Sequence, residues 1–213
     1  MTHSNRLVVL TASLLTLVSV PSLAQQRPLV TEDPESVGSG LVLVEGGFDY
    51  VRDQQYPVSG LEGHRFRAPT LGLSVGVSSI AEIQIDGVSY QQLSVTNRAE
   101  APLSRFADIN GDTTSDMDDI VIGAKTRLLS ETGRRPAIGL RFATRLPNAG
   151  NESGLGLDTF DFINTLLVGK TVGAVRVIGN IGLGILSDPT RGDRQNDVVV
   201  YGFSLARAMN EAV

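Results

Sequence analysis

The sequence contains no cysteine and no tryptophan, and only 5% of its residues are aromatic. Without cysteine there are no disulfide bonds, so an exported protein of this composition must be stabilised by a large core, a closed barrel or a membrane. The formal net charge of −5 argues against a nucleic-acid partner. Beyond its N-terminal region the sequence has no apolar stretch near the roughly 20 residues that a membrane-spanning helix needs. If this chain crosses a membrane, it must therefore do so with strands.

The N-terminus has the three-part pattern of a secretory signal peptide. Arg6 precedes an apolar run at residues 7–20, and Pro21 leads into a small-residue site that ends at Ala24. The run is short for a membrane anchor, and the small residues favour cleavage after Ala24. We therefore expect residues 1–24 to be a signal peptide and the protein to be exported. Residues 25–40 are polar and contain two prolines, which predicts a periplasmic lead segment without regular structure.

Residues 119–146 show the clearest strand pattern. Apolar residues alternate with small or cationic ones over residues 120–128 and again over 138–146, with a polar turn between them. Alternation with a period of two predicts a β-hairpin that has one apolar face and one polar face. In a membrane barrel the apolar face would contact lipid, whereas in a soluble sheet the polar face would contact water.

The same alternation predicts eight antiparallel strands. They are expected at residues 41–52, 66–77, from 80 onward, in the two arms of 119–146, and at 159–170, 175–186 and 197–207. These strands are close to the ~9–11 residues that cross a bilayer, and longer than the ~5–6 typical of soluble proteins. Long connections at 53–65, 96–118, 147–158 and 187–196 alternate with short turns, as in outer-membrane barrels. The predicted fold is an all-β transmembrane barrel formed by residues 41–213.

The polar faces of these strands carry ions among small residues. Burying so many ions unpaired in a soluble core would cost several kcal/mol each, which favours a barrel with a polar interior over an exported soluble domain. Acidic residues of the first and third strands would form one wall and basic residues the other, giving a transverse field across a pore. Alternatively, the charges pair and fill the interior, as in small barrels. The candidate lumen-lining residues are Glu45, Asp49, Glu82, Asp86, Lys125, Arg127, Arg141, Arg145, Asp161 and Arg176.

Residues 31–50, 119–128, 141–162 and 175–186 resemble the outer-membrane proteins grouped as the "MetA pathway of phenol degradation" family. The resemblance covers nearly all of the chain after residue 24, and strand patterns rather than catalytic motifs carry it. It implies a β-barrel that passes small, often aromatic, molecules. Members of that family have more strands, and bacterial barrels end on an aromatic residue, whereas this chain ends just after the eighth strand. We therefore expect a barrel that is truncated at its C-terminus and so incomplete.

Two motifs in the sequence resemble sites of other chemistry. Residues 72–76 match the G-x-S-x-G motif of hydrolases, but no histidine follows Ser74 to act as its base, so we expect no enzyme. Residues 108–119 space oxygen-bearing side chains like a calcium loop, although Thr113 replaces the usual glycine and Asp119 the usual glutamate. The candidate ligands are Asp108, Asn110, Asp112, Thr114, Asp116 and Asp119.

The sequence thus predicts an outer-membrane channel for passive passage of small solutes, with lipid and a small molecule as its partners and no required cofactor. The alternative is a non-conducting structural or binding barrel that acts through its external loops and binds calcium there. The sequence leaves the solute and the oligomeric state open.

Overall fold

The computed structural model describes residues 10–12 and 31–207, and almost all of its regular structure is extended. The strands are β1 (Leu10–Ala12), β2 (Val42–Tyr56), β3 (Leu61–Gly76), β4 (Ala81–Arg98), β5 (Thr113–Met117), β6 (Val121–Leu129), β7 (Ala137–Arg145), β8 (Asp161–Val172), β9 (Val175–Ser187) and β10 (Gln195–Arg207). One 3-10 turn, η1 (Ser104–Phe106), interrupts them. The predicted signal peptide and its cleavage site lie outside the described residues, apart from β1. Nowhere in the described chain is there a helix long and apolar enough to span a membrane.

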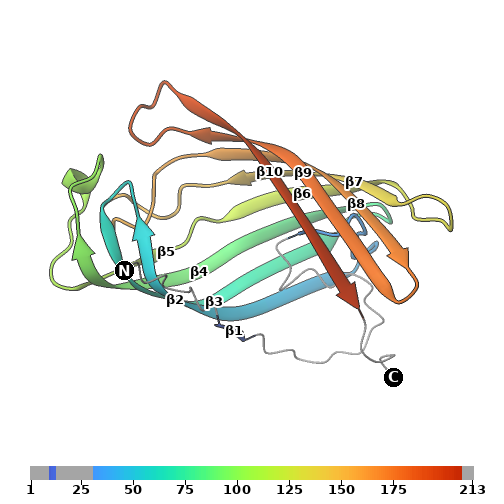
Figure 1. Ribbon diagram of the computed structural model, residues 1–213, viewed down its shortest axis with the longest axis horizontal. Coiled ribbons are helices and arrows are strands. Elements are labelled where there is room, and N and C mark those ends of the chain that lie inside the picture. The colour runs from blue at the N-terminus through green and yellow to red at the C-terminus, as the bar shows by residue number, and fades with distance from the viewer. Residues whose placement is uncertain (1–9, 13–30, 208–213) are drawn as a thin grey trace, which may run out of the picture.

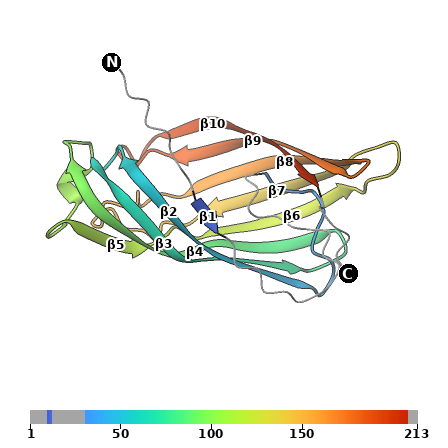
Figure 2. The same ribbon diagram turned by 60° about the horizontal axis from the view of Figure 1, so that its bottom comes forward.

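The strands form one antiparallel sheet that curls around a hollow (Figures 1 and 2). Its order is β1-β2-β3-β4-β6-β7-β8-β9-β10, and β5 pairs with the outer part of β4. The eight long strands follow one another as hairpin neighbours, which confirms the predicted all-β barrel-like fold. In the described residues, β10 pairs with β9 and the sheet order ends there, so the curled sheet forms a half-barrel.

The two faces of the sheet have the reverse of the polarity of a soluble protein. The Lys125 side chain, on the concave face of β6, is 0% exposed, whereas Tyr201 on the convex face of β10 is 85% exposed. Polar residues on the concave face, such as Gln84 and Glu82, are buried as deeply as a normal core. On the convex face of β9 and β10 the exposed apolar side chains are Ile181, Leu183, Ile185, Val199, Phe203 and Leu205. Strand alternation therefore sends large apolar residues outward and ions inward.

The two ends of the half-barrel differ in the length of their connections. At the turn end, on the right in Figure 1, residues 77–80, 130–136 and 173–174 join the strands. At the opposite loop end, residues 99–120, 146–160 and 188–194 make the longer connections. The two-residue turn between β8 and β9 relies on Gly173, whose φ of +61° suits glycine. The predicted alternation of long and short connections is thus present from β3 onward.

The first connection differs from the prediction. Residues 53–65 were expected to be a long loop, but β2 and β3 extend into a hairpin whose turn is only residues 57–60. At the outer end of this hairpin, Leu61 packs with Leu93 of β4 and Leu155 of the β7–β8 connection in a small apolar core. Pro57 and Gly60 signalled a turn correctly, but sequence alternation could not show that the flanking polar residues remain paired as strands.

Candidate functional site

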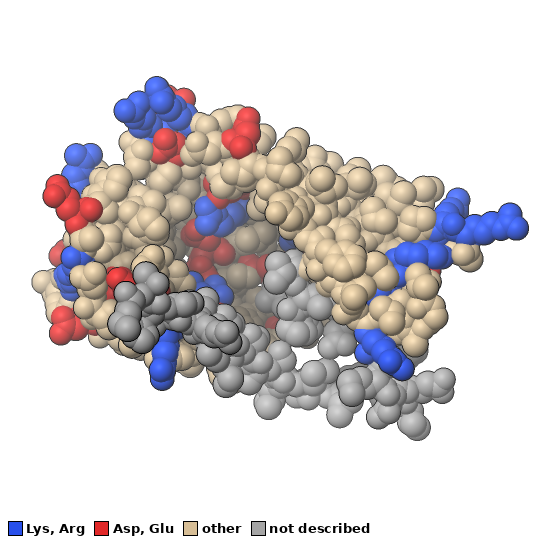
Figure 3. All heavy atoms as spheres, viewed as in Figure 1, with Lys and Arg blue, Asp and Glu red and all other residues tan. Residues whose placement is uncertain are grey.

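The predicted lumen charges lie on the concave face, where they pair closely. Lys125 of β6 stands 3.0 Å from Glu82 of β4, and Arg141 of β7 stands 3.5 Å from Asp86. Arg145 contacts Asp161 on the adjacent strand and Asp119 at 3.7 Å. Figure 3 shows acidic and basic side chains inside the hollow, while the visible outer wall between the two ends consists mainly of other residues.

The expectation of two separated walls of opposite sign is wrong at these positions. β4 and β6 are neighbours in the sheet, and Glu82 is directly opposite Lys125 in their register. On the first hairpin, Asp49 pairs with Arg67 of β3, a cation that the sequence analysis did not select. Glu45 lies on the same side of β2 as Asp49. The acidic and basic side chains therefore neutralise one another locally, which corresponds to the paired alternative rather than to a transverse field.

Residues 31–37, which we call the lead segment, cross the concave face at the turn end. The hydroxyls of Thr31 and Ser204 of β10 share a hydrogen bond of 2.5 Å, and the Glu32 N–H donates to the Asn180 side chain of β9 over 2.7 Å. At the other side of the hollow the Val37 N–H donates to a Glu82 carboxylate oxygen over 2.7 Å. This segment was expected to be a periplasmic lead without regular structure. It has no regular structure, but its place is within the curl of the sheet.

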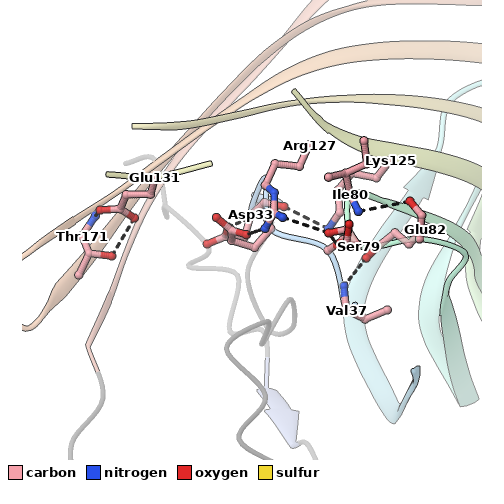
Figure 4. A network of polar contacts seen from close by, with 12 residues as sticks. Asp33, Val37, Ser79, Ile80, Glu82, Lys125, Arg127, Glu131 and Thr171 are labelled. Atoms are coloured by element: carbon pink, nitrogen blue, oxygen red, sulfur yellow. Dashed lines mark hydrogen bonds and ion pairs between the residues drawn. The ribbon is translucent and has the colours of Figure 1, made fainter. Parts of the chain in front are cut away.

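Each carboxylate of the lead segment contacts a cation of the sheet. The Arg176 Nε and Nη2 groups donate to the two oxygens of Asp33, both over 2.8 Å. Glu32 lies 2.8 Å from Arg141 and 3.3 Å from Lys125. Figure 4 shows Lys125 and Arg127 pointing from β6 toward the lead segment and the β3–β4 turn, and Arg127 also pairs with Glu35. These contacts fill the turn end of the lumen with ion pairs.

Glycines of the sheet make room for the lead segment. A Cβ atom at Gly202 of β10 would lie 2.7 Å from Thr31 Cγ2, and one at Gly169 of β8 would lie 3.0 Å from Pro34 Cδ. Pro34 is buried against this surface. The small residues on the concave face thus leave the space that the lead segment occupies.

At the turn end, Glu131 joins two hairpins. It lies in the β6–β7 turn and accepts hydrogen bonds from the Thr171 N–H over 2.9 Å and from Arg176. Lys170 Nζ is 3.2 Å away. Partial burial alone would raise the pKa of Glu131, but the hydrogen bonds from Thr171, Lys170 and Arg176 outweigh it and lower the pKa to about 2.

At the loop end the lumen opens into a cavity of about 270 Å³. Its polar lining includes Tyr56, Arg65, Gln91 and Arg145. The Nε atoms of both arginines are buried without a hydrogen-bond partner in the described chain, although Arg65 stands 3.9 Å from Asp49. This vestibule has room for a small polar molecule between the loop-end connections and the paired charges below.

The structure does not assemble the predicted calcium loop. Residues 113–117 form the extended strand β5, in which alternate side chains are roughly 7 Å apart and cannot converge on one ion. Asp119 Oδ1 instead accepts the N–H groups of Asn148 and Ala149, and Asp116 accepts that of Gly150. Across the described residues, no three His, Cys, Asp or Glu side chains are grouped to hold a metal. Three of the six candidate ligands, Thr114, Asp116 and Asp119, instead hold the β7–β8 connection by hydrogen bonds.

The G-x-S-x-G segment lies within strand β3. Ser74 is a buried residue of the concave face, paired in register with Gln84 of β4 and Leu43 of β2. A nucleophile elbow requires a sharp strand-to-helix turn, which residues 72–76 do not make. Ser74 is therefore one of the small residues that line the hollow.

Three carboxylates that complete the site, Glu32, Asp33 and Glu35, were not predicted from the sequence. The available signal was chemical, because the strands from β6 to β9 carry five predicted lumen cations and an acidic segment precedes the first long strand. Comparison of the chain with protein-family models, curated proteins and solved structures finds no match.

Proposed function

We propose that this protein is an outer-membrane β-barrel through which small solutes pass passively along a charge-lined lumen. The reversed polarity of the sheet is the observation that carries this proposal. A buried lysine inside and a convex face of exposed Ile, Leu, Val and Phe side chains suit lipid outside and a polar interior. In water the same outer face would be a large apolar surface exposed to solvent.

The loop end of the lumen supports the entry of small molecules. The loop-end vestibule of about 270 Å³ offers an entrance lined by arginines, glutamine and a tyrosine. Below it, Arg141, Lys125 and Arg176 line the interior as far as the turn end. The resemblance to barrels that pass aromatic molecules makes small aromatic acids the first solutes to test.

Conductance of the full-length protein tests this proposal. After refolding in detergent and insertion into a planar bilayer, we expect discrete current steps in KCl and swelling of liposomes that are loaded with protein. A heat-unfolded sample provides the control. Absence of both current and solute flux from correctly inserted protein would contradict the channel proposal.

The lead segment favours a second candidate, a barrel that binds rather than conducts. Its acids fill the turn end of the lumen with ion pairs to Arg176, Arg141 and Arg127. In that case the vestibule would retain a ligand without passing it. Equilibrium binding of a radiolabelled solute to inserted protein, together with zero flux in the same liposomes, would identify this function.

A further inference from the structure

The carboxylates of the lead segment bind arginine and lysine side chains of the sheet in the geometry that a free carboxylate would adopt. Arg176 offers the edge formed by its Nε and Nη2 atoms, and both oxygens of Asp33 are bound there at 2.8 Å. This two-point geometry is the usual way in which arginine recognises a carboxylate. A free molecule with a carboxylate group could make the same pair of hydrogen bonds.

Two more carboxylates occupy the neighbouring cations. Glu32 reaches Arg141 Nε at 2.8 Å and Lys125 Nζ at 3.3 Å, while Glu35 pairs with Arg127. Lys125 is completely buried under this arrangement. The segment therefore presents three carboxylates to four cations that lie on three strands, β6, β7 and β9.

If the lead segment moved away, donor groups would be left open in the lumen. Glu82, Asp86 and Glu131 would still accompany Lys125, Arg141 and Arg176. In the described chain, Arg127 has Glu35 as its carboxylate partner, so it would lose that ion pair. Counting Lys170, which also contacts Glu131, the emptied site would hold five cations and three carboxylates, and this excess of two positive charges suits a small molecule with two carboxylates.

The attachment of the segment to the sheet suits a movable plug. Gly38 and Gly40 follow the segment with φ angles of +94° and +74°, and the Gly40 N–H binds the Gly76 carbonyl over 2.8 Å. The segment is thus a tethered ligand next to its own site. A short tether gives an effective concentration on the order of millimolar, so a free carboxylate would compete in that range.

We propose that residues 31–37 act as a tethered carboxylate ligand that closes the turn end of the lumen, and that small dicarboxylates displace it and occupy the same cations. This inference rests on the proposed barrel and lumen. It names the solute class of that lumen and the chain segment that competes with it.

A disulfide lock tests whether the segment closes the lumen. The chain has no cysteine, so T31C/S204C introduces a single possible pair at hydroxyls that are 2.5 Å apart. We expect the oxidised protein to conduct at least about tenfold less than the same protein after reduction. Equal conductance in both states, with the disulfide verified by mass spectrometry, would overturn the plug while leaving the channel intact.

Variants that release the segment give the reverse result. E32Q/D33N/E35Q removes its charges, and G202V wedges Thr31 out sterically without any change of charge. Both should conduct several-fold more than the wild type and the reduced double-cysteine protein, because in those two proteins the segment still occupies the site for part of the time. The controls are E100Q/D108N/E152Q, which removes three charges at the loop end, and G179V, where no atom lies within 4 Å of a new Cβ. Release variants that conduct no more than these controls would also overturn the plug.

Succinate binding separates this inference from the channel proposal. Isothermal titration of inserted protein should show succinate binding to E32Q/D33N/E35Q at least about tenfold more tightly than to the wild type, with no binding of the uncharged 1,4-butanediol. Equal succinate affinity in the two proteins would overturn the carboxylate site. A shift in affinity without conductance in any variant would support the site and overturn the channel.

Discussion

Lys125 shows best how this lumen is built. A lysine with no exposed surface is rare in proteins unless it is paired, and here Glu82 and Glu32 stand 3.0 and 3.3 Å from its ammonium group. The Asp33 carbonyl accepts a further hydrogen bond over 3.1 Å. The positive charge is therefore compensated by one strand and by the lead segment together.

Replacing Lys125 with methionine should destabilise the protein strongly. The substitution keeps the side-chain volume but leaves the Glu82 carboxylate buried without its cation, which typically costs about 3–5 kcal/mol. The matched control is Lys170→Met at the partly exposed turn end, for which we expect a loss of at most about 1 kcal/mol. Urea unfolding of both variants in lipid vesicles measures the difference, and equal losses would contradict the buried ion pair.

Glu131 gives the turn end a defined dependence on pH. Its pKa is lowered from 4.5 to about 2, so its hydrogen bonds to Thr171, Lys170 and Arg176 stabilise the folded state above the unfolded pKa. That stabilisation should be lost as the pH falls from about 4.5 through about 2. We expect the stability difference between wild type and E131Q to be constant from pH 5 to 7 and to shrink below that window. A difference that persisted unchanged at pH 2 would contradict this account.

Among the elements, the two-faced strands were the most predictable part of the molecule. The alternation in residues 119–146 predicts β6, β7 and the turn between them, and the structure confirms the pair. Alternation is a local property of the chain, so it predicts a strand and its two faces correctly wherever one face is uniformly apolar.

The outer part of the first hairpin could not be predicted, because this part of the sequence lacks such a local alternation. Around residues 53–65 the sequence is mixed and polar, and its strands are held by the neighbouring β4 and by the Leu61 core rather than by their own pattern. The lead segment was still harder to place. Nothing local distinguishes its polar residues from a linker, because its position depends on cations that lie far away along the chain.

A lysine on the convex face tests whether these strands meet lipid. Ile181 lies at the middle of β9 and is exposed on the convex face. A lysine in the midplane of a bilayer costs about 2–4 kcal/mol in barrel proteins, so Ile181→Lys should destabilise the inserted protein by that amount. Gly192→Lys in the β9–β10 connection provides the control, and we expect almost no change there. Similar small effects at both sites would indicate that the convex face lies in water.

At the scale of the whole molecule, the half-barrel has three zones along its axis. An apolar core and the long connections form a platform at the loop end, paired charges fill the middle, and the lead segment closes the turn end. The order of the zones follows from the chain topology, because the turns at residues 77–80, 130–136 and 173–174 fall at one end and the longer connections at the other (Figure 2).

The most direct test of this account is the solvent around β9. Single cysteines at residues 178–185 of the cysteine-free chain can each carry a nitroxide label in protein inserted into vesicles. We predict that labels at 179, 181, 183 and 185 collide often with oxygen, which concentrates in lipid, and rarely with a water-soluble nickel chelate, while the alternate positions collide little with oxygen. If the odd-numbered labels met the nickel chelate as often as a label at Gly192 does, the convex face would lie in water and the membrane barrel would be wrong.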